Sequence, residues 1–126
     1  MVIIMNDPYI SFYLRTHRIH IYIETLRAIG CPERVCFMIN NDGDQLILSP
    51  YTKRDLLSHR VPRGVYHGTD EFEVSSFRLC EIIATLHNLD PNKSYKVLGN
   101  TMHKYHMIRF DLKRAVEIGT DSTFRF

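Results

Sequence analysis

The sequence predicts a single α+β domain built from two β-α-β-β units related by a pseudo-twofold axis. Residues 9–51 are expected to form a strand, a short helix, a Pro-containing turn and a hairpin, and residues 71–112 repeat that order. The length of 126 residues suits one domain. We expect unit one at about 9–51, a connector at about 52–70, unit two at about 71–118 and a tail at 119–126. The two units would pack as a barrel-like body or as an open, mixed or antiparallel sheet.

Unit one begins with two segments in which apolar and polar residues alternate, residues 10–15 and 19–23. This alternation has the period of a half-buried strand. Residues 15–18 between them predict an exposed turn. A short helix is expected from Glu24 to Ile29, because Gly30 can adopt the left-handed conformation that ends a helix.

The rest of unit one predicts a hairpin. Val35 to Ile39 has strand character, and the Asn-Asn-Asp-Gly sequence at 40–43 is the strongest hairpin signal in the chain. On the returning strand, Pro50 is expected either to end the strand or to mark a sheet edge. The connector at 52–70 is the least regular segment, and we expect a further short strand around Leu56, Leu57 and Val61.

Unit two contains the best-supported helix. A strand with Phe72 and Val74 leads to Ser75, which we expect to cap a helix over 76–89. Its helically spaced apolar residues are expected in the core: Leu79, Ile82, Ile83, Leu86 and Leu89. A strand from Tyr95, a turn at Gly99-Asn100 and a strand from Met107 to Leu112 complete the unit.

Composition narrows the class of protein. Hydrophobic residues make up 44% and charged residues 24% of the chain, as in ordinary globular proteins. No apolar run is long enough to cross a membrane. Three cysteines and no secretion signal predict reduced thiols and a cytoplasmic location.

No catalytic or cofactor motif is present. Cys31, Cys36, His103 and His106 do not have the spacing of a structural zinc site, and Cys80 has the position of a core residue. We therefore expect no metal, no cofactor and no enzymatic activity.

Two basic segments are candidates for phosphate contact, although the net charge is only +2. The first lies in a turn, strand and helix interleaved with Tyr13 and Tyr22, and comprises Arg15, His17, Arg18, His20 and Arg27. Cationic and hydrogen-bonding side chains on a rigid β-element suit phosphate binding. The second lies in the connector and comprises Lys53, Arg54, Arg60 and Arg63. The alternatives are an ordinary solvated sheet face and a solvated loop.

The segment RIHIYIETLRAIG at 18–30 resembles the core phrase of AbrB-like and MraZ-like regulators, in which a basic turn leads to a short strand and a helix ending at Gly. Val35 to Pro50 matches the following hairpin, so the resemblance covers about residues 15–51. It implies a swapped-hairpin barrel, a homodimer, and DNA contacts from Arg15, Arg18 and Arg27, with His17 and His20 as further candidates. The sequence departs from the family where His17 replaces a frequent Gly and Tyr22 a usual Pro.

A second resemblance covers more of the chain. From Asp42 to Leu112 the order of hairpin, linker, strand, helix and strands is similar to that of one domain of a DNA sliding clamp. Clamps encircle DNA with several such domains, so this resemblance implies an oligomer or a mimic.

The expected function is that of a non-enzymatic, cytoplasmic, homodimeric regulator associated with DNA. The alternative is a protein–protein interaction module, such as a clamp-like adaptor or a small inhibitor encoded by a phage or mobile element, without nucleic-acid contact. An exposed aromatic patch would favour the module, and its candidates are Tyr13, Tyr22, Tyr51 and Tyr66.

Overall fold

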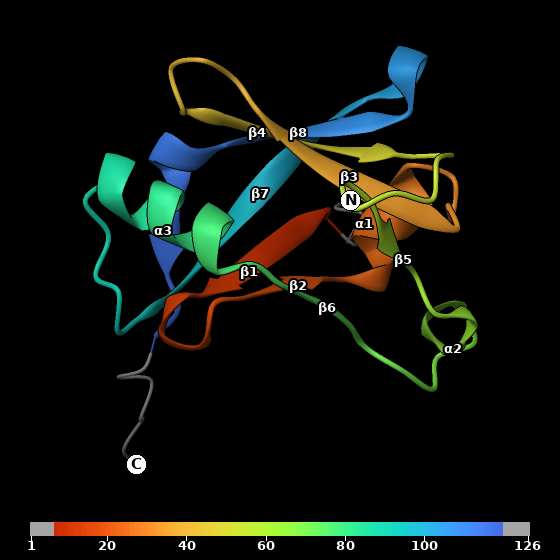
Figure 1. The fold of residues 1–126 in the computed structure, drawn as a ribbon, viewed down its shortest axis with the longest axis horizontal. Coiled ribbons are helices and arrows are strands. Elements are labelled where there is room, and N and C mark those ends of the chain that lie inside the picture. Colours follow the sequence, from red (N-terminus) through yellow and green to blue (C-terminus); the bar gives the residue numbers. More distant parts are fainter. Residues whose placement is uncertain (1–6, 120–126) are drawn as a thin grey trace, which may run out of the picture.

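The computed structural model describes residues 7–119, which form an α+β fold dominated by antiparallel strands (Figure 1). Within these residues nine strands join into one sheet that curls into a nearly closed barrel. The strands are β1 (Tyr9–Tyr13), β2 (Arg18–Ile21), β3 (Arg34–Ile39), β4 (Gln45–Pro50), β5 (His59–Arg60), β6 (Phe72–Ser75), β7 (Ser94–Met102), β8 (Met107–Asp111) and β9 (Val116–Glu117).

Helices are few and short. The α-helices are α1 (Ile23–Ala28), α2 (Arg63–Tyr66) and α3 (Phe77–Leu86), and the 3₁₀ turns are η1 (Leu14–Thr16), η2 (His103–Tyr105) and η3 (Leu112–Arg114). Among residues 7–119, no helix has the length and apolar character that a membrane-spanning segment requires.

The order of the strands reflects the predicted repeat. Across the sheet the order is β5-β3-β4-β8-β7-β1-β2-β6, with β9 paired to β7. The units β2-α1-β3-β4 and β6-α3-β7-β8 have the same element order, and equivalent strands pair antiparallel, β2 with β6 and β4 with β8. This pairing pattern is the one expected of two units related by a pseudo-twofold axis, and the predicted α+β class with a barrel-like antiparallel sheet is confirmed.

The strand that precedes each unit also joins the sheet. The strand that precedes unit one's β2, namely β1, pairs with β7 of unit two. The strand that precedes unit two's β6, namely β5, pairs with β3 of unit one. β1 therefore pairs with a strand of each unit, and the connector strand β5 extends the half of the sheet that belongs to unit one.

The core lies inside the curled sheet. Alternating residues of the central strands point inward and are fully buried: Ile10, Phe12, Ile19, Leu46, Leu48, Val97, Ile108 and Phe110. The predicted alternation fails at Ser11, which is also buried, because β1 is covered on both faces. Thr25 of α1 is buried as well, and its hydroxyl donates to the Tyr9 carbonyl oxygen at 2.6 Å.

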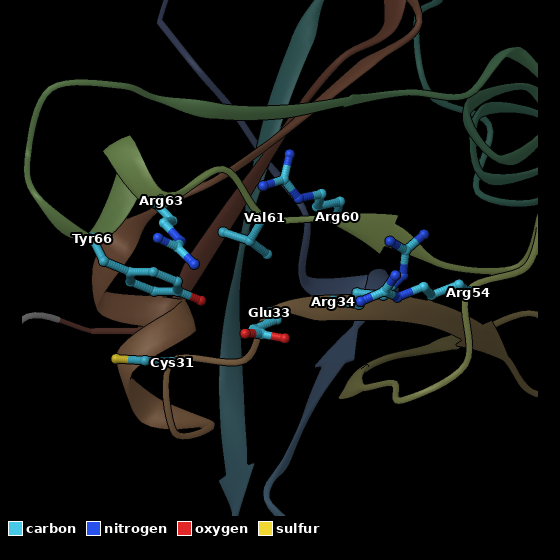
Figure 2. Close-up of a pocket in the computed structure, with 8 residues that line it drawn as sticks. All are labelled: Cys31, Glu33, Arg34, Arg54, Arg60, Val61, Arg63 and Tyr66. Atoms are coloured by element: carbon cyan, nitrogen blue, oxygen red, sulfur yellow. The ribbon is translucent and has the colours of Figure 1, made fainter.

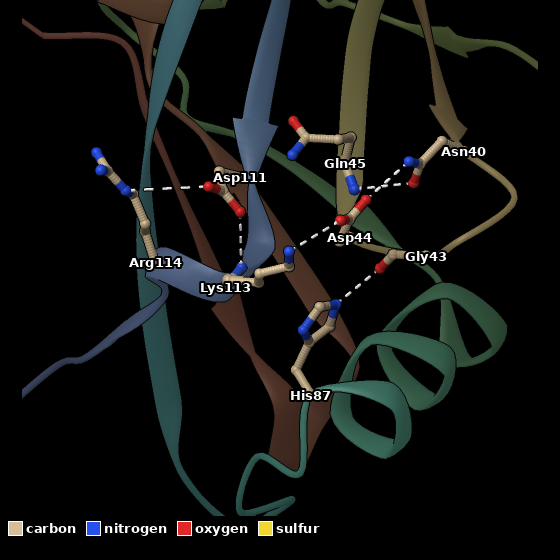
Figure 3. A network of polar contacts seen from close by, with 8 residues as sticks. All are labelled: Asn40, Gly43, Asp44, Gln45, His87, Asp111, Lys113 and Arg114. Atoms are coloured by element: carbon tan, nitrogen blue, oxygen red, sulfur yellow. Dashed lines mark hydrogen bonds and ion pairs between the residues drawn. The ribbon is translucent and has the colours of Figure 1, made fainter.

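The predicted turn at 40–43 is stabilised by an internal hydrogen bond and by contacts with residues next to α3 and in η3 (Figure 3). Gly43 has a left-handed φ of 74°, and its carbonyl oxygen accepts a hydrogen bond from His87 Nε2 at 2.7 Å. Asp44 Oδ1 accepts from Asn40 at 2.7 Å, and Lys113 Nζ lies 3.2 Å from Asp44 Oδ2. These contacts lower the pKa of Asp44, with the Asn40 hydrogen bond as the largest cause. The turn is thus fixed to the end of α3 and to η3.

The connector differs from the prediction. The short strand forms at His59–Arg60, and residues 56 and 57 lie outside it, with Leu56 fully exposed and Leu57 69% exposed. Pro62 is the N-cap of the one-turn helix α2 and has an extended conformation.

Three details of unit two also differ. The cap of α3 is Ser76 and not Ser75, because the Ser76 hydroxyl accepts from the Leu79 N–H at 3.2 Å. Leu86 is 57% exposed and lies outside the core. Residues 99–100 are not a turn but lie inside β7, and the turn falls at η2. The predicted tail lies outside the described residues from 120 onward.

Candidate functional site

The first predicted basic group does not form one site. Arg15 lies in η1 and Arg27 in α1, and Figure 1 places these two elements at opposite ends of β2. His17 closes η1 in a left-handed conformation, with its ring 4.6 Å from that of Phe77. The group is therefore divided between two regions of the surface.

A carboxylate offsets part of the charge on β2. Arg18 Nη1 lies 3.3 Å from Glu73 Oε1 on the neighbouring β6. His20 is 8% exposed, and its Nδ1 lies 3.7 Å from Glu73 Oε2. Arg15 and Arg27 are exposed and form no ion pair with a described residue. Arg15 is thus more available than Arg18 as a phosphate ligand.

The second basic group is brought together. Arg54, Arg60 and Arg63 line a pocket of about 450 Å³, whereas Lys53 is exposed but does not line it. The pocket has a fourth arginine that the sequence analysis did not select, Arg34 at the start of β3. Figure 2 shows Arg63 beside Tyr66 at the left of the view, Arg60 near the centre, and Arg34 and Arg54 at the right.

Backbone pairing positions these arginines. Arg34 of β3 lies directly opposite Arg60 of β5 in the antiparallel ladder. Arg34 is further oriented because its Nε donates to Ser58 Oγ at 2.8 Å. Arg63 is the first residue of α2. Two parts of the chain, residues 31–34 and residues 54–66, thus meet at one pocket.

The aromatic wall of the pocket is fixed. The Tyr66 hydroxyl donates to the Pro32 carbonyl oxygen at 2.6 Å, which ties α2 to the segment before β3. Burial, with a smaller contribution from Cys31, raises the pKa of Tyr66. Tyr66 therefore remains a neutral hydroxyl at physiological pH and acts as a structural wall.

The positive charge of the pocket is only partly balanced by the protein. Glu33 is the one carboxylate among its lining residues. None of the four arginines forms an ion pair with any residue between 7 and 119. Like charges directly opposite each other in antiparallel strands destabilise the pairing. An anion between the arginines would remove this repulsion and accept charge-assisted hydrogen bonds.

Two of the three thiols are buried and unreactive. Cys36 and Cys80 are buried, and burial raises the pKa of both, that of Cys80 to about 11. Such thiols stay protonated and unreactive. Cys31 is exposed at the pocket in a left-handed conformation. Within the described part of the chain, no group of three or more His, Cys, Asp or Glu side chains is placed to hold a metal ion.

The surroundings of the tyrosines bear on the predicted aromatic patch. Tyr13, Tyr22, Tyr51 and Tyr66 are all half-buried rather than exposed. Tyr22 accepts or donates a hydrogen bond with Ser11 at 2.7 Å, and Tyr51 donates to Asp55 at 2.9 Å. The most exposed large apolar residues are instead leucines of the connector.

Comparison with known proteins gives no relative. No family model, curated protein or solved structure matches this chain.

Proposed function

We propose that this protein is a non-enzymatic regulator associated with DNA, and that it contacts DNA phosphates mainly through the arginine pocket. The observation that carries the proposal is the unbalanced pairing of Arg34 with Arg60, joined at the same pocket by Arg54 and Arg63. Guanidinium groups bind phosphate oxygens bidentately, and phosphate contacts supply most of the affinity of non-specific DNA binding.

The basic turn is a secondary contact in this proposal. Arg15 is exposed, and Arg18 is already paired with Glu73. The paired guanidinium must exchange a carboxylate for a phosphate, so its net contribution to DNA binding is smaller. Arg27, His17, His20 and Lys53 remain candidates outside the pocket.

The proposal also includes a homodimer in the cytoplasm, following the resemblance to AbrB-like regulators. A dimer would present two arginine pockets to one duplex. Two linked contacts raise the overall affinity without any new interaction.

The first experiment measures binding to a mixed pool of duplex DNA at about 50 and about 200 mM salt. We expect micromolar or tighter binding that falls steeply with salt, because each phosphate contact releases counterions. The Arg60→Ala/Arg63→Ala variant should bind more weakly. It should also reduce the slope of log affinity against log salt concentration by about two, since each lost phosphate contact reduces that slope by about one. The Arg15→Ala/Arg18→Ala variant should have a smaller effect.

The matched control is Arg109→Ala/Arg114→Ala, which removes the same charge at exposed positions outside the pocket. A control variant that weakens binding as much as the pocket variant would show that only net charge matters. Absence of binding at the low salt concentration would reject the DNA proposal and favour a protein–protein module. Measuring the mass in the same buffers distinguishes a dimer from the 14.9 kDa monomer.

A further inference from the structure

The barrel has an open seam beside β3. The end strands of the sheet order are β5 and β6, and among the described residues they do not pair with each other. β5 covers β3 only at Arg34 and Val35. Residues 36–39 of β3 therefore form a sheet edge without a neighbouring strand on that side in the described part of the chain.

The backbone of this edge has free hydrogen-bonding groups. Glu33 directs its carbonyl oxygen toward the β5 side, where it accepts from the Val61 N–H at 2.8 Å. Alternate residues of an antiparallel strand direct their N–H and C=O groups to the same side. Val35, Phe37 and Ile39 therefore face this edge. No described residue forms a backbone hydrogen bond with Phe37 or Ile39 there.

An apolar hollow lies next to the free edge. It has a volume of about 400 Å³ and is bounded by β3, the connector and α3. Phe37, Ile39, Leu57 and Ile82 are among its lining residues. Phe37 and Ile39 are only partly buried, although the inward-facing residues of the other strands are fully buried. The core is thus exposed at this seam.

We propose that this edge binds an extended segment of another protein, which adds a strand to β3 and inserts apolar side chains between β3 and α3. A free strand edge supplies backbone hydrogen bonds, and a groove beside it selects alternate side chains. The proposal goes beyond DNA binding, because the hollow and the arginine pocket share no lining residue.

The charge of the hollow favours an acidic segment. Arg78 lines it, and no Asp or Glu does. His59 also lines it, but burial, followed by the charge of Arg34, lowers the pKa of His59, so its ring is neutral near pH 7. A second copy of this chain fits less well as the occupant. A symmetric contact places the same patch of both copies face to face, and the residues that line the hollow offer no carboxylate to the Arg78 of the other copy.

The experiment titrates the full chain with pools of capped eight-residue peptides and follows its backbone amide resonances. In the first pool Val, Ile, Leu or Phe alternates with Glu, and in the second pool Lys replaces Glu. We expect the glutamate pool to shift the amides of Phe37, Ile39 and Ile82, and the lysine pool to bind at least about tenfold more weakly because Arg78 repels it. No shift with the glutamate pool at millimolar concentration would overturn the proposal.

Two further pools test the backbone contact. Both pools have the side chains of the glutamate pool. In one pool the backbone nitrogen of every glutamate is methylated, and in the other pool the backbone nitrogen of every apolar residue is methylated. An added strand donates its backbone N–H groups to β3 from alternate residues only, so one of the two methylated pools must lose binding. Equal binding by both would overturn strand addition.

A substitution in the hollow and a control substitution elsewhere test where the peptide binds. Leu57→Asp should weaken binding of the glutamate pool about tenfold, because it removes a leucine from the hollow. Leu98→Asp, at an exposed leucine of β7, should change it less than about twofold, within the usual effect of a surface substitution. Equal effects would contradict the assignment. Shifts of the same amides with protein concentration alone would identify a second copy as the occupant and reject the proposal.

Discussion

At the scale of residues, Arg34 and Arg60 illustrate how a candidate site depends on neighbours that are distant in sequence. Each is an ordinary polar residue of a short strand when taken alone. The β3–β5 pairing places them opposite each other, and this creates the unbalanced charge of the pocket. Arg34 was not predicted as a site residue, because no local signal indicates which strand will lie beside it.

Gly99 is a residue whose role also became clear from its neighbours. It lies inside β7, and an added Cβ would contact Ile108 and lie 2.6 Å from Phe110 Cε1, both on β8. We expect Gly99→Ala to lower the free energy of unfolding by about 1–3 kcal/mol through overpacking. Urea denaturation measures this change in the free energy of unfolding. Asn100→Ala, the exposed neighbouring position, should change stability by less than about 0.5 kcal/mol. Equal losses for both variants would contradict the packing argument.

At the scale of elements, the start of α3 tests the assigned cap. The Ser76 hydroxyl accepts from the Leu79 N–H, whereas no hydrogen bond is seen for the exposed Ser75 side chain among residues 7–119. We expect Ser76→Ala to cost about 1 kcal/mol of stability and Ser75→Ala less than about 0.5 kcal/mol. Thermal and urea unfolding of both variants give the comparison. A larger loss of stability for Ser75→Ala than for Ser76→Ala would support Ser75 as the N-cap, as predicted from the sequence.

Elements with strong local signals were predicted closely. The helix over 24–29 forms as α1 at Ile23–Ala28, and Gly30 has the expected positive φ of 88°. The Asn-Asn-Asp-Gly turn forms between β3 and β4, where Gly43 also has a positive φ. The connector was predicted poorly, since a two-residue strand and a one-turn helix are stabilised by tertiary contacts rather than by local propensity.

At the scale of the whole molecule, the strand pairing makes the two units interdependent. The β1–β7, β2–β6 and β4–β8 pairings join strands on either side of the connector, and the β3–β5 pairing joins unit one to the connector itself. We expect a chain cut between Arg54 and Asp55, in the exposed connector, to remain one folded body. Fragments 1–54 and 55–126 expressed separately should be unfolded, because each would lack partners for its strands. Size-exclusion chromatography and circular dichroism test both statements. A separately folded fragment would contradict the interdependence.

The sequence by itself determined the fold class, the doubled β-α-β-β order, the hairpin turn and most strand positions, because these depend on hydrophobic period and on residues with special backbone conformations. It also indicated the connector as basic. Only the tertiary structure decided that Arg34 joins Arg54, Arg60 and Arg63, that Glu73 offsets Arg18, and that β3 keeps an open edge. These features arise from pairings between distant strands. Their register depends on the closure of the whole sheet, which no local pattern records.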